Sequence, residues 1–275
     1  MRSPKQIYAL KRKRVWVAGH TGMVGSALTR RLEGEDCTIL TVGRDRLDLR
    51  DQDAVHVWTT QEKPDAIFLA AAMVGGIDAN RSRPADFIYN NLSIETNIIH
   101  AAWKNDVEKL MFLGASCIYP KLSPQPMREE ELLGGPLEPT NQWYAIAKIA
   151  GIMLCQAFRK QYGCDFISAQ PTNLYGIGDN FDLQSSHVLP ALMAKAHQAK
   201  IDGVKYLEVW GSGKPKREFL FIDDLADALI HLIKHYSGNI QINVGTGKDI
   251  SIRETAELMC RVVGFNGELK FDASM

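Results

Sequence analysis

The chain has 275 residues, of which 32 are basic and 32 acidic, so its composition gives no sign of a nucleic acid or an anionic membrane as partner. Its longest apolar run, residues 66–77, is too short to span a bilayer, and the basic stretch 1–14 lacks the apolar segment and cleavage site of a signal peptide. Five scattered cysteines without a C-x-x-C pair favour the reducing cytoplasm over a disulfide-stabilised or zinc-binding protein.

A glycine-rich turn follows the first β-prone run, residues 14–18, and precedes a helical pattern at residues 26–32. This order suits a dinucleotide, because glycines let the backbone approach a pyrophosphate and the helix N-terminus offers free N–H groups. The spacing is G-x-x-G-x-x-G rather than the G-x-G-x-x-G fingerprint, and a glycine turn without a ligand is the alternative. The turn consists of Gly19, His20, Thr21, Gly22, Met23, Val24 and Gly25.

The second expected strand, residues 37–42, is followed by Gly43 and Arg44. At this place dinucleotide folds use an acidic residue for the ribose 2′-hydroxyl, or an arginine for a 2′-phosphate. Arg44, with Arg46 close by, therefore favours NADP(H) as the cofactor. The alternative is a solvated turn of mixed charge, since Asp45 stands between the two arginines.

From residue 14 to residue 170, β-prone and helical segments alternate, and the β-prone segments are apolar. This pattern predicts an α/β, Rossmann-type, doubly wound parallel sheet with helices on both faces, and with function at the carboxyl ends of its strands. The alanines at 70–72 would admit a ligand there, or would pack tightly in the core. The remaining expected elements are helices 51–61 and 87–104, strands 65–70 and 109–114, a loop 121–140, a helix ending at residue 162 and a strand 165–170.

Beyond Gly176 the alternation breaks, and we expect a smaller, interleaved lobe that closes over a substrate. The cofactor domain would comprise residues 1–175, with 218–247 returning to it, and the substrate lobe would comprise 176–217 and 248–275. The expected elements are helix 187–199, strands 206–210 and 218–222, a helix to residue 235, strand 240–244, helix 251–263 and strand 269–271.

Tyr144 and Lys148 stand four residues apart in a helix-forming run, which puts a phenol and an ammonium on one helix face. A nearby cation lowers the pKa of a tyrosine, so the pair could exchange protons near neutral pH. A chance pair on a solvated helix is the alternative.

The glycine turn and the Tyr-x-x-x-Lys pair together resemble the extended short-chain dehydrogenase/reductase family. Longer stretches, from about residue 14 to residue 274, are similar to the branch of this family that forms GDP-L-fucose. They include Leu69-Ala-Ala-Ala-Met-Val-Gly-Gly-Ile77, Pro84-Ala-Asp-Phe-Ile-Tyr89, Ser116-Cys-Ile-Tyr-Pro-Lys121, Leu137-Glu-Pro-Thr-Asn141, Pro171-Thr-Asn-Leu-Tyr-Gly176 and Val209-Trp-Gly-Ser-Gly213.

The resemblance implies a cytoplasmic homodimer that acts on GDP-4-keto-6-deoxy-D-mannose. Members of this branch epimerise C3 and C5 and then reduce the C4 ketone with NADPH. Tyr144 would protonate the C4 oxygen, and Lys148 would hold the nicotinamide ribose. Cys117 and His187 would move protons at C3 and C5, with pKa values close enough to neutral for that work.

The resemblance also assigns binding residues. The contacts to the GDP-sugar would come from Lys195, Trp210 and Arg217, the first of which is usually Arg. Without the resemblance, Cys117 would be a small buried hydrophobic residue, His187 the start of a helix, Trp210 a core residue and Arg217 a surface charge. The cofactor contacts would be the glycine turn together with Arg44, Asp48, Leu49, Leu113, Gly114, Ser116, Lys148, Pro171, Thr172, Asn173, Leu174 and His187.

The chain departs from the family pattern in three places. Ala115 stands where the family has a serine beside the Tyr and Lys, and the loss of one such hydroxyl donor costs about a hundredfold or more in rate. Ser116 follows it, but strand alternation would turn its side chain the other way. Thr21 stands where bacterial members often have an arginine near the 2′-phosphate, and family members continue past the position of Met275, which would leave the substrate lobe truncated.

Two other hypotheses remain open on these residues. One is a related nucleotide-sugar epimerase or dehydratase that keeps its cofactor tightly bound. The other is a catalytically disabled NADP-binding protein. Ala115 and the short C-terminus support this hypothesis. The evidence against it is that the candidate catalytic residues are preserved, namely Tyr144, Lys148, Cys117 and His187.

Overall fold

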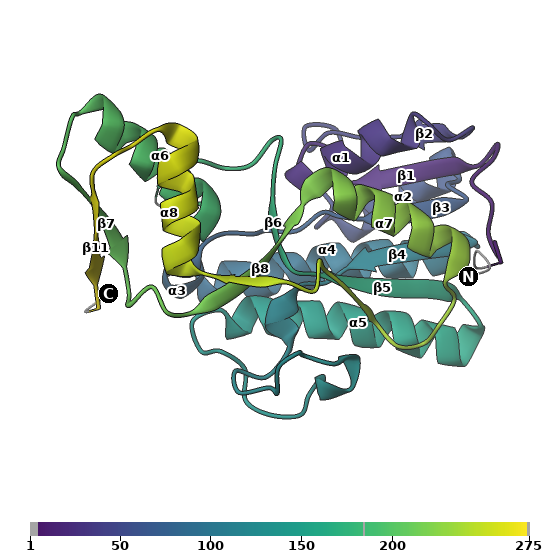
Figure 1. Cartoon of the computed structure of the whole chain (residues 1–275). Helices are drawn as coiled ribbons and strands as arrows, with labels where there is room; N and C mark the ends of the chain where they lie inside the picture. Colours follow the sequence, from purple (N-terminus) through teal and green to yellow (C-terminus); the bar gives the residue numbers. More distant parts are fainter. Residues whose placement is uncertain (1–4, 184, 274–275) are drawn as a thin grey trace.

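The central feature of the fold is a six-stranded parallel sheet, seen in the right-hand part of Figure 1. The computed structural model describes residues 5–183 and 185–273. The strand order β2-β1-β3-β4-β5-β9 confirms the expected α/β, Rossmann-type sheet, and its reversal between β1 and β3 creates a crevice at the carboxyl ends of these strands. The strands are β1 (Arg14–Ala18), β2 (Thr38–Leu40), β3 (Ala66–Leu69), β4 (Lys109–Leu113), β5 (Asp165–Pro171) and β9 (Ile242–Val244).

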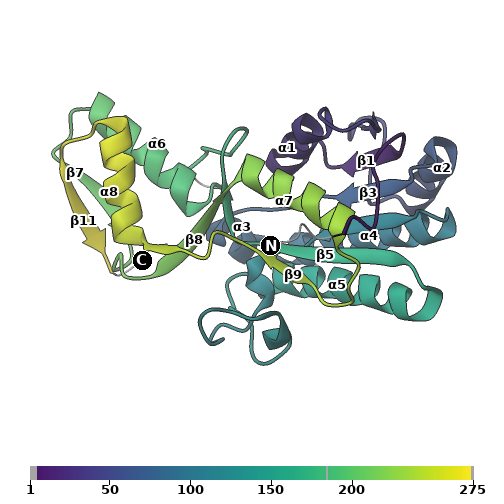
Figure 2. The same cartoon turned by 45° about the vertical axis from the view of Figure 1, so that its right-hand side comes forward.

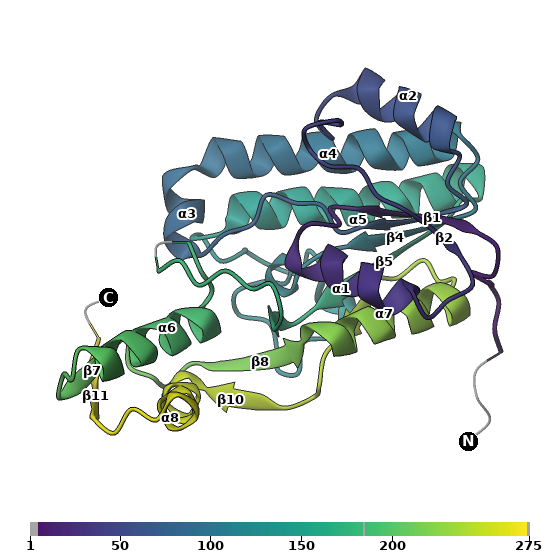
Figure 3. The same ribbon diagram turned by 90° about the horizontal axis from the view of Figure 1, so that it is seen from above.

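Helices cover both faces of this sheet, and Figure 3 shows the sheet between the two helical layers. The alternation of strand side chains explains the two layers: Trp16, Ile67 and Phe112 face one core, and the neighbouring Val17, Phe68 and Met111 face the other. One layer holds α1 (Met23–Leu32) and α7 (Ile222–His235), and the other holds α2 (Gln52–Glu62), α4 (Pro84–Lys104) and α5 (Gln142–Tyr162).

The second lobe, on the left in Figure 1, has a small core of its own. Its elements are α6 (Val188–Ile201), α8 (Ile252–Val263) and the parallel pair β7 (Tyr206–Trp210) and β11 (Glu268–Asp272). Helix α8 begins with a capping box between Ser251 and Glu254 and ends at Gly264, whose φ of 77° favours glycine. Leu192, Val209 and Met259 lie in the core of this lobe.

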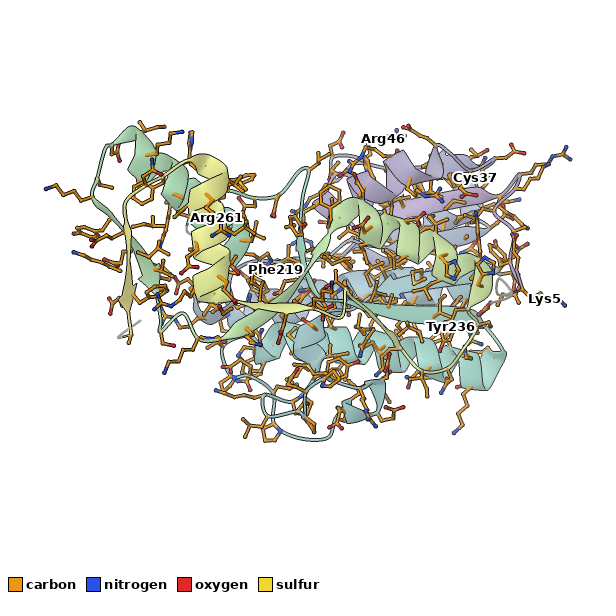
Figure 4. The ribbon with its side chains drawn as sticks, viewed as in Figure 1. Lys5, Cys37, Arg46, Phe219, Tyr236 and Arg261 are labelled. Atoms are coloured by element: carbon orange, nitrogen blue, oxygen red, sulfur yellow. The ribbon has the colours of Figure 1, made fainter. Side chains whose placement is uncertain are left out.

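A three-stranded sheet of order β10-β8-β6 connects the two lobes. Strand β8 (Lys216–Phe221) runs parallel to β6 (Asn173–Tyr175) and antiparallel to β10 (Asp249–Ser251). Figure 2 shows β9 beside β5, with the chain then crossing to α8, and Figure 4 labels Phe219 on β8 between the lobes. The lobes are therefore joined by paired strands rather than by a single linker.

Several boundaries differ from the expected ones. Helix α4 begins at Pro84 rather than at residue 87, because proline is well suited to the first turn of a helix. Strand β2 is shorter than the expected 37–42, and β6, β10 and α3 (Ile77–Ser82) were not expected. These unexpected elements are six residues long or less, and the two strands exist only through distant pairing. Expectations for residues 1–4, 184 and 274–275 lie outside the described residues.

Candidate active site

The glycine turn after β1 has the shape of a phosphate-binding turn. Gly19 has a φ of 89°, and a Cβ there would lie 2.7 Å from Cα of Ala71. A Cβ on Gly25 would collide with the carbonyl oxygen of Gly19. Both glycines are therefore required by the fold itself, since they allow the turn to pass closely between β3 and α1.

Gly22 is different, because nothing in the protein excludes a side chain there. Its φ is −77°, and the nearest atom to an added Cβ is the carbonyl oxygen of Gly19 at 3.5 Å. Gly22 is the N-cap of α1, and no side chain caps this helix end. The uncapped N–H groups and the open space beside Gly22 fit the pyrophosphate of a dinucleotide.

The segment after β2 carries the residues expected at the adenosine ribose. Arg44 and Arg46 are exposed, and neither makes an ion pair with a residue in the ranges 5–183 and 185–273. Figure 4 labels Arg46 at the upper edge of the molecule. Asp48 pairs with Arg50 at 2.6 Å, and this bond, with a smaller contribution from Arg44, holds the pKa of the Asp48 carboxyl at about 2. The two unpaired guanidinium groups are free to meet a phosphate.

Tyr144 and Lys148 lie on the inner side of α5, close together as expected. Lys148 is buried, and its Nζ lies 4.8 Å from the centre of the Phe112 ring and 5.8 Å from the centre of the Tyr144 ring. Oε1 of Glu95, on α4, lies 2.9 Å from the same Nζ. The sequence analysis did not single out Glu95. The sequence did contain a signal for this residue. Glu95 stands three residues before Ile98 in the helix expected at 87–104, and this spacing places its carboxylate on the inner face of that helix.

The expectation that Lys148 lowers the pKa of Tyr144 is wrong. Burial, together with the nearby Cys117 and Glu95, raises the pKa of Tyr144 well above its usual value. Lys148 is paired with Glu95, and burial raises the pKa of that carboxyl although Lys148 opposes the shift. Tyr144 is therefore a proton donor at neutral pH.

Ala115, Ser116 and Cys117 follow β4 at its carboxyl end. Ala115 is the last extended residue, with φ −156° and ψ 157°, and a 3₁₀ turn, Ser116–Ile118, begins directly after it. The argument from strand alternation therefore does not apply to Ser116, because this residue is no longer in a strand.

Cys117 is the middle residue of this turn and is partly buried, and burial raises its pKa to about 12, although the charge of Lys148 opposes the shift. The expectation of a near-neutral thiol pKa is therefore wrong. The physical reason is that the apolar surroundings disfavour the thiolate more than Lys148 favours it.

Two polar side chains at the carboxyl end of β5 are buried without hydrogen-bond partners among the described residues. They are Gln170, through both polar atoms of its amide, and Thr172, through its hydroxyl. Gln170 packs against Gly114, where a Cβ would collide with its amide oxygen. Asn173 donates to the carbonyl of Glu218 at 3.0 Å. The expected cofactor residues 171–174 thus lie at the base of the connecting sheet, and the unpartnered groups leave hydrogen-bonding capacity for a ligand.

His187 lies on the second lobe, as the N-cap of α6, with an exposed side chain. The loop before it contacts the first lobe, because the N–H of Gly76 donates to the carbonyl of Ser185 at 3.0 Å. No hydrogen bond joins Cys117 to His187 within the described ranges. Burial raises the pKa of the nearby Asp179 carboxyl. The expected pair therefore comes from different lobes.

The expected GDP-sugar residues lie around α6, β7 and β8. Nζ of Lys195 lies 4.4 Å from the centre of the Trp210 ring, and Arg217 is exposed on β8. A cavity of about 410 Å³ lies nearby, but these three side chains do not line it. It is mainly apolar, and its walls include Tyr175, Phe181, Leu189, Met193 and Phe221.

Comparison with known proteins agrees with this geometry. The model of the NAD dependent epimerase/dehydratase family matches residues 15–245. The GDP-L-fucose synthase of Sinorhizobium fredii is 60% identical over 268 residues, covering 98% of this chain and 85% of that protein. The GDP-L-fucose synthase of Escherichia coli is 54% identical over 275 residues, with coverages of 96% and 86%.

A solved structure has the same arrangement of elements. The GDP-L-fucose synthetase from Naegleria fowleri bound to NADP superposes with a TM-score of 0.90 at 30% identity, over 98% of this chain and 84% of that one. The chain therefore belongs to the NAD dependent epimerase/dehydratase family, and its relatives of 54–60% identity include GDP-L-fucose synthases.

Proposed function

We propose that this chain converts GDP-4-keto-6-deoxy-D-mannose into GDP-L-fucose, by epimerising C3 and C5 and reducing the C4 ketone with NADPH. The observation that carries the proposal is the cluster of Tyr144, Lys148 and Cys117 at the carboxyl edge of the parallel sheet. The support from relatives is that proteins 54–60% identical to this chain carry the name GDP-L-fucose synthase.

In the reduction, NADPH supplies the hydride that C4 receives. The protonated phenol of Tyr144 gives its proton to the C4 oxygen, and before that it donates a hydrogen bond to the enolate oxygen that forms when C3 or C5 loses a proton. Cys117 and His187 exchange protons with C3 and C5. Because burial favours the thiol, Cys117 has to lose its proton before it acts as a base, and Lys148 is the cation that favours this loss.

The cofactor contacts follow the parts of the chain that fit NADP(H). The N–H groups at the start of α1 would hold the pyrophosphate, and Arg44 with Arg46 would hold the 2′-phosphate. Lys148 would hold the nicotinamide ribose. The remaining contacts would be those expected from the sequence at the carboxyl ends of β4 and β5. The unpartnered hydroxyl of Thr172 supports this arrangement.

The second lobe, residues 176–217 and 248–273, would bind the GDP-sugar. Lys195 and Arg217 supply positive charge, and a guanidinium binds a diphosphate in bidentate fashion. Trp210 is 48% exposed, which is unusual for a tryptophan that serves only as core. His187 belongs to the same lobe, so closure of this lobe would bring its imidazole to the sugar.

We also propose a cytoplasmic homodimer built on α4 and α5. Large apolar side chains are exposed on these helices, and they include Tyr89, Trp143, Met153 and Tyr162. No helix in the described part of the chain is long and apolar enough to cross a membrane. Light scattering at micromolar concentration tests the dimer, and a monomeric mass would contradict it.

The test of the activity is NADPH oxidation with GDP-4-keto-6-deoxy-D-mannose, with the product identified by NMR. Tyr144→Phe is the control, because it removes only the phenolic hydroxyl that gives the proton. GDP-L-fucose as the product supports the proposal. If NADPH is oxidised and the product keeps the original configuration at C3 and C5, the chain is a simple reductase. If the protein binds NADPH and no product forms, the disabled form suggested by Ala115 is favoured.

A further inference from the structure

A contact between the two lobes lies directly before His187. The loop after β3 in the first lobe meets the segment before α6 in the second lobe, where the N–H of Gly76 donates to the carbonyl of Ser185 at 3.0 Å. Strand β3 lies beside β4, and the turn that carries Cys117 follows β4. The contact therefore holds the segment before His187 against the edge of the sheet at which Cys117 lies.

Gly76 leaves no room for a side chain at this contact. A Cβ there would lie 2.8 Å from the carbonyl oxygen of Ser186, whereas ordinary contact begins at 3.4 Å. A larger residue would therefore push this oxygen away by about half an ångström or more. The φ of Gly76 is −65°, which any residue can adopt. The close approach of the two lobes, and not the backbone conformation, is thus the reason for a glycine here.

The loop that carries Gly76 is held firmly within the first lobe. The buried side chain of Asn91, on α4, accepts from the N–H of Met73 at 2.8 Å and donates to its carbonyl at 3.0 Å. The buried Asn80, on α3, donates to the carbonyls of Gly75 and Gly76 at 2.8 and 3.0 Å. Two buried amides therefore fix the position at which the second lobe is met.

The segment on the other side of the contact transmits its position to His187. The N–H groups of Ser185 and Ser186 donate to the carbonyl of Asp182 at 3.2 and 2.8 Å. His187 follows as the extended N-cap of α6, with φ −76° and ψ 169°. Because one planar peptide group joins Ser186 to His187, a displacement of the Ser186 carbonyl also moves His187.

We propose that Gly76 is a positioning residue, whose N–H and missing side chain let the second lobe approach and set the imidazole of His187 for proton transfer at C3 and C5. This inference deepens the proposed function and rests on it for the role of His187. Tyr144 belongs to the first lobe and does not depend on this contact. A displaced His187 should therefore impair inversion at C3 and C5 more than hydride transfer to C4.

Hydrogen exchange followed by mass spectrometry tests the contact in the cofactor-free protein, without any substrate. In Gly76→Ala we expect the amides of Ser185 and Ser186 to exchange about fivefold faster or more than in the wild type. The reason is that the displaced segment opens its hydrogen bonds to Asp182 more often. Equal exchange of these amides in the two proteins overturns the inference.

Gly75→Ala is the matched control in the same loop. Its Cβ would lie 2.9 Å from Cβ of Ala79 and 3.2 Å from the Phe87 ring, and both residues belong to the first lobe. This variant therefore crowds the loop without touching Ser186, and the amides before His187 should exchange as in the wild type. Equal acceleration in Gly75→Ala and Gly76→Ala would show a general loosening of the loop and would contradict the inference.

The product mixture shows whether the position of His187 serves the reaction. With GDP-4-keto-6-deoxy-D-mannose and NADPH, we expect the share of reduced product that keeps its original configuration at C3 or C5 to rise about tenfold or more in Gly76→Ala. NMR measures this share. General damage to the protein lowers the total rate but leaves the mixture unchanged, as we expect for Gly75→Ala. A wild-type mixture from Gly76→Ala overturns the inference.

Asn80→Ala decides if Gly76→Ala does not fold or forms no product. This variant keeps Gly76 and removes the amide that holds the carbonyls of Gly75 and Gly76. It should give the same changes at smaller size, and the absence of both changes overturns the inference. If the exchange behaves as expected and the wild type makes no product, the proposed function fails and the lobe contact stands. If the wild type makes product and neither exchange nor mixture changes, only the role of Gly76 fails.

Discussion

Nζ of Lys195 lies 4.4 Å from the centre of the Trp210 ring, so the middle of α6 and the end of β7 share one cation–π contact. Burial lowers the pKa of Lys195, while Glu208 favours its charged form. The indole thus holds the ammonium in place at low conformational cost. A positive charge fixed beside an aromatic face fits one end of a nucleoside diphosphate.

Trp210→Ala is expected to raise KM for the GDP-sugar about tenfold, which corresponds to ~1.4 kcal/mol of binding free energy. The reason is the loss of both the aromatic face and the support of Lys195. The dissociation constant of NADPH, measured by fluorescence titration, should not change, because Trp210 belongs to the other lobe.

Tyr206→Ala is a matched control on the same strand. Tyr206 and Trp210 are each 48% exposed, and Lys270 lies 3.7 Å from the centre of the Tyr206 ring. This variant removes a similar contact at the opposite end of β7 and should leave KM unchanged. Equal effects of the two variants would show that the lobe is destabilised and that Trp210 has no special place in binding.

Ala115→Ser is expected to raise kcat, by up to about a hundredfold, with little change in KM. The new hydroxyl would stand at the end of β4, directly before the 3₁₀ turn that carries Cys117. A donor that acts only on the developing oxyanion changes kcat more than substrate affinity. The measurement is steady-state NADPH oxidation. An unchanged kcat would mean that Ser116 or Tyr144 already supplies this hydrogen bond.

Gly22→Ala and Gly25→Ala should separate binding from folding. Gly22 has an ordinary φ and open space, so the alanine variant should keep its melting temperature within about 3 °C and lose NADPH affinity tenfold or more. Gly25→Ala should destabilise the protein by about 1–3 kcal/mol, because its methyl group collides with the glycine turn. Thermal melts and fluorescence titrations give both quantities. Unaltered NADPH affinity in Gly22→Ala would contradict a pyrophosphate at this turn.

Cys117 should react slowly with iodoacetamide, and its rate should keep increasing up to a pH of about 12, without a plateau near neutrality. Its folded-state pKa is raised above the ordinary value, so the folded chain retains this proton more tightly. The resulting stabilisation is present below the ordinary thiol pKa and is lost as the pH rises towards about 12. Mass spectrometry of the peptide with Cys117 measures the labelling, and Cys117→Ser identifies its signal. A plateau below pH 8 would show a stabilised thiolate.

The sequence was sufficient to predict the parallel sheet, because each expected strand in the first half of the chain is an apolar run followed by a helical pattern. It was also sufficient for the glycine turn and for Tyr144 with Lys148, because these are local spacings. The contact between Glu95 and Lys148 could not be predicted. The two residues are distant along the chain, and only the packed helices reveal that both are buried.

The expectations for the pKa values of Tyr144 and Cys117 were wrong for the same physical reason. Spacing shows which charges are neighbours, but the direction of a pKa shift depends on burial, which is the largest cause at both groups and outweighs Lys148 at Cys117. The strand β6 was missed because its three residues are extended only through their pairing with β8. Short pairings of this kind leave no periodic pattern in a sequence.

Arg44→Ala is expected to weaken NADPH binding at least tenfold, an effect of ~1.4 kcal/mol or more, and to leave NADH binding unchanged. The reason is that the exposed Arg44 makes no ion pair with the described residues, so its charge is available to a 2′-phosphate that NADH lacks. Arg261→Ala, on α8 of the other lobe in Figure 4, is the control for the loss of one exposed positive charge. Fluorescence titrations with both cofactors give the affinities, and the difference between wild type and Arg44→Ala should shrink as salt screens the contact. Equal losses for NADPH and NADH would place Arg44 elsewhere on the cofactor, and the preference for the phosphorylated dinucleotide would then rest on Arg46.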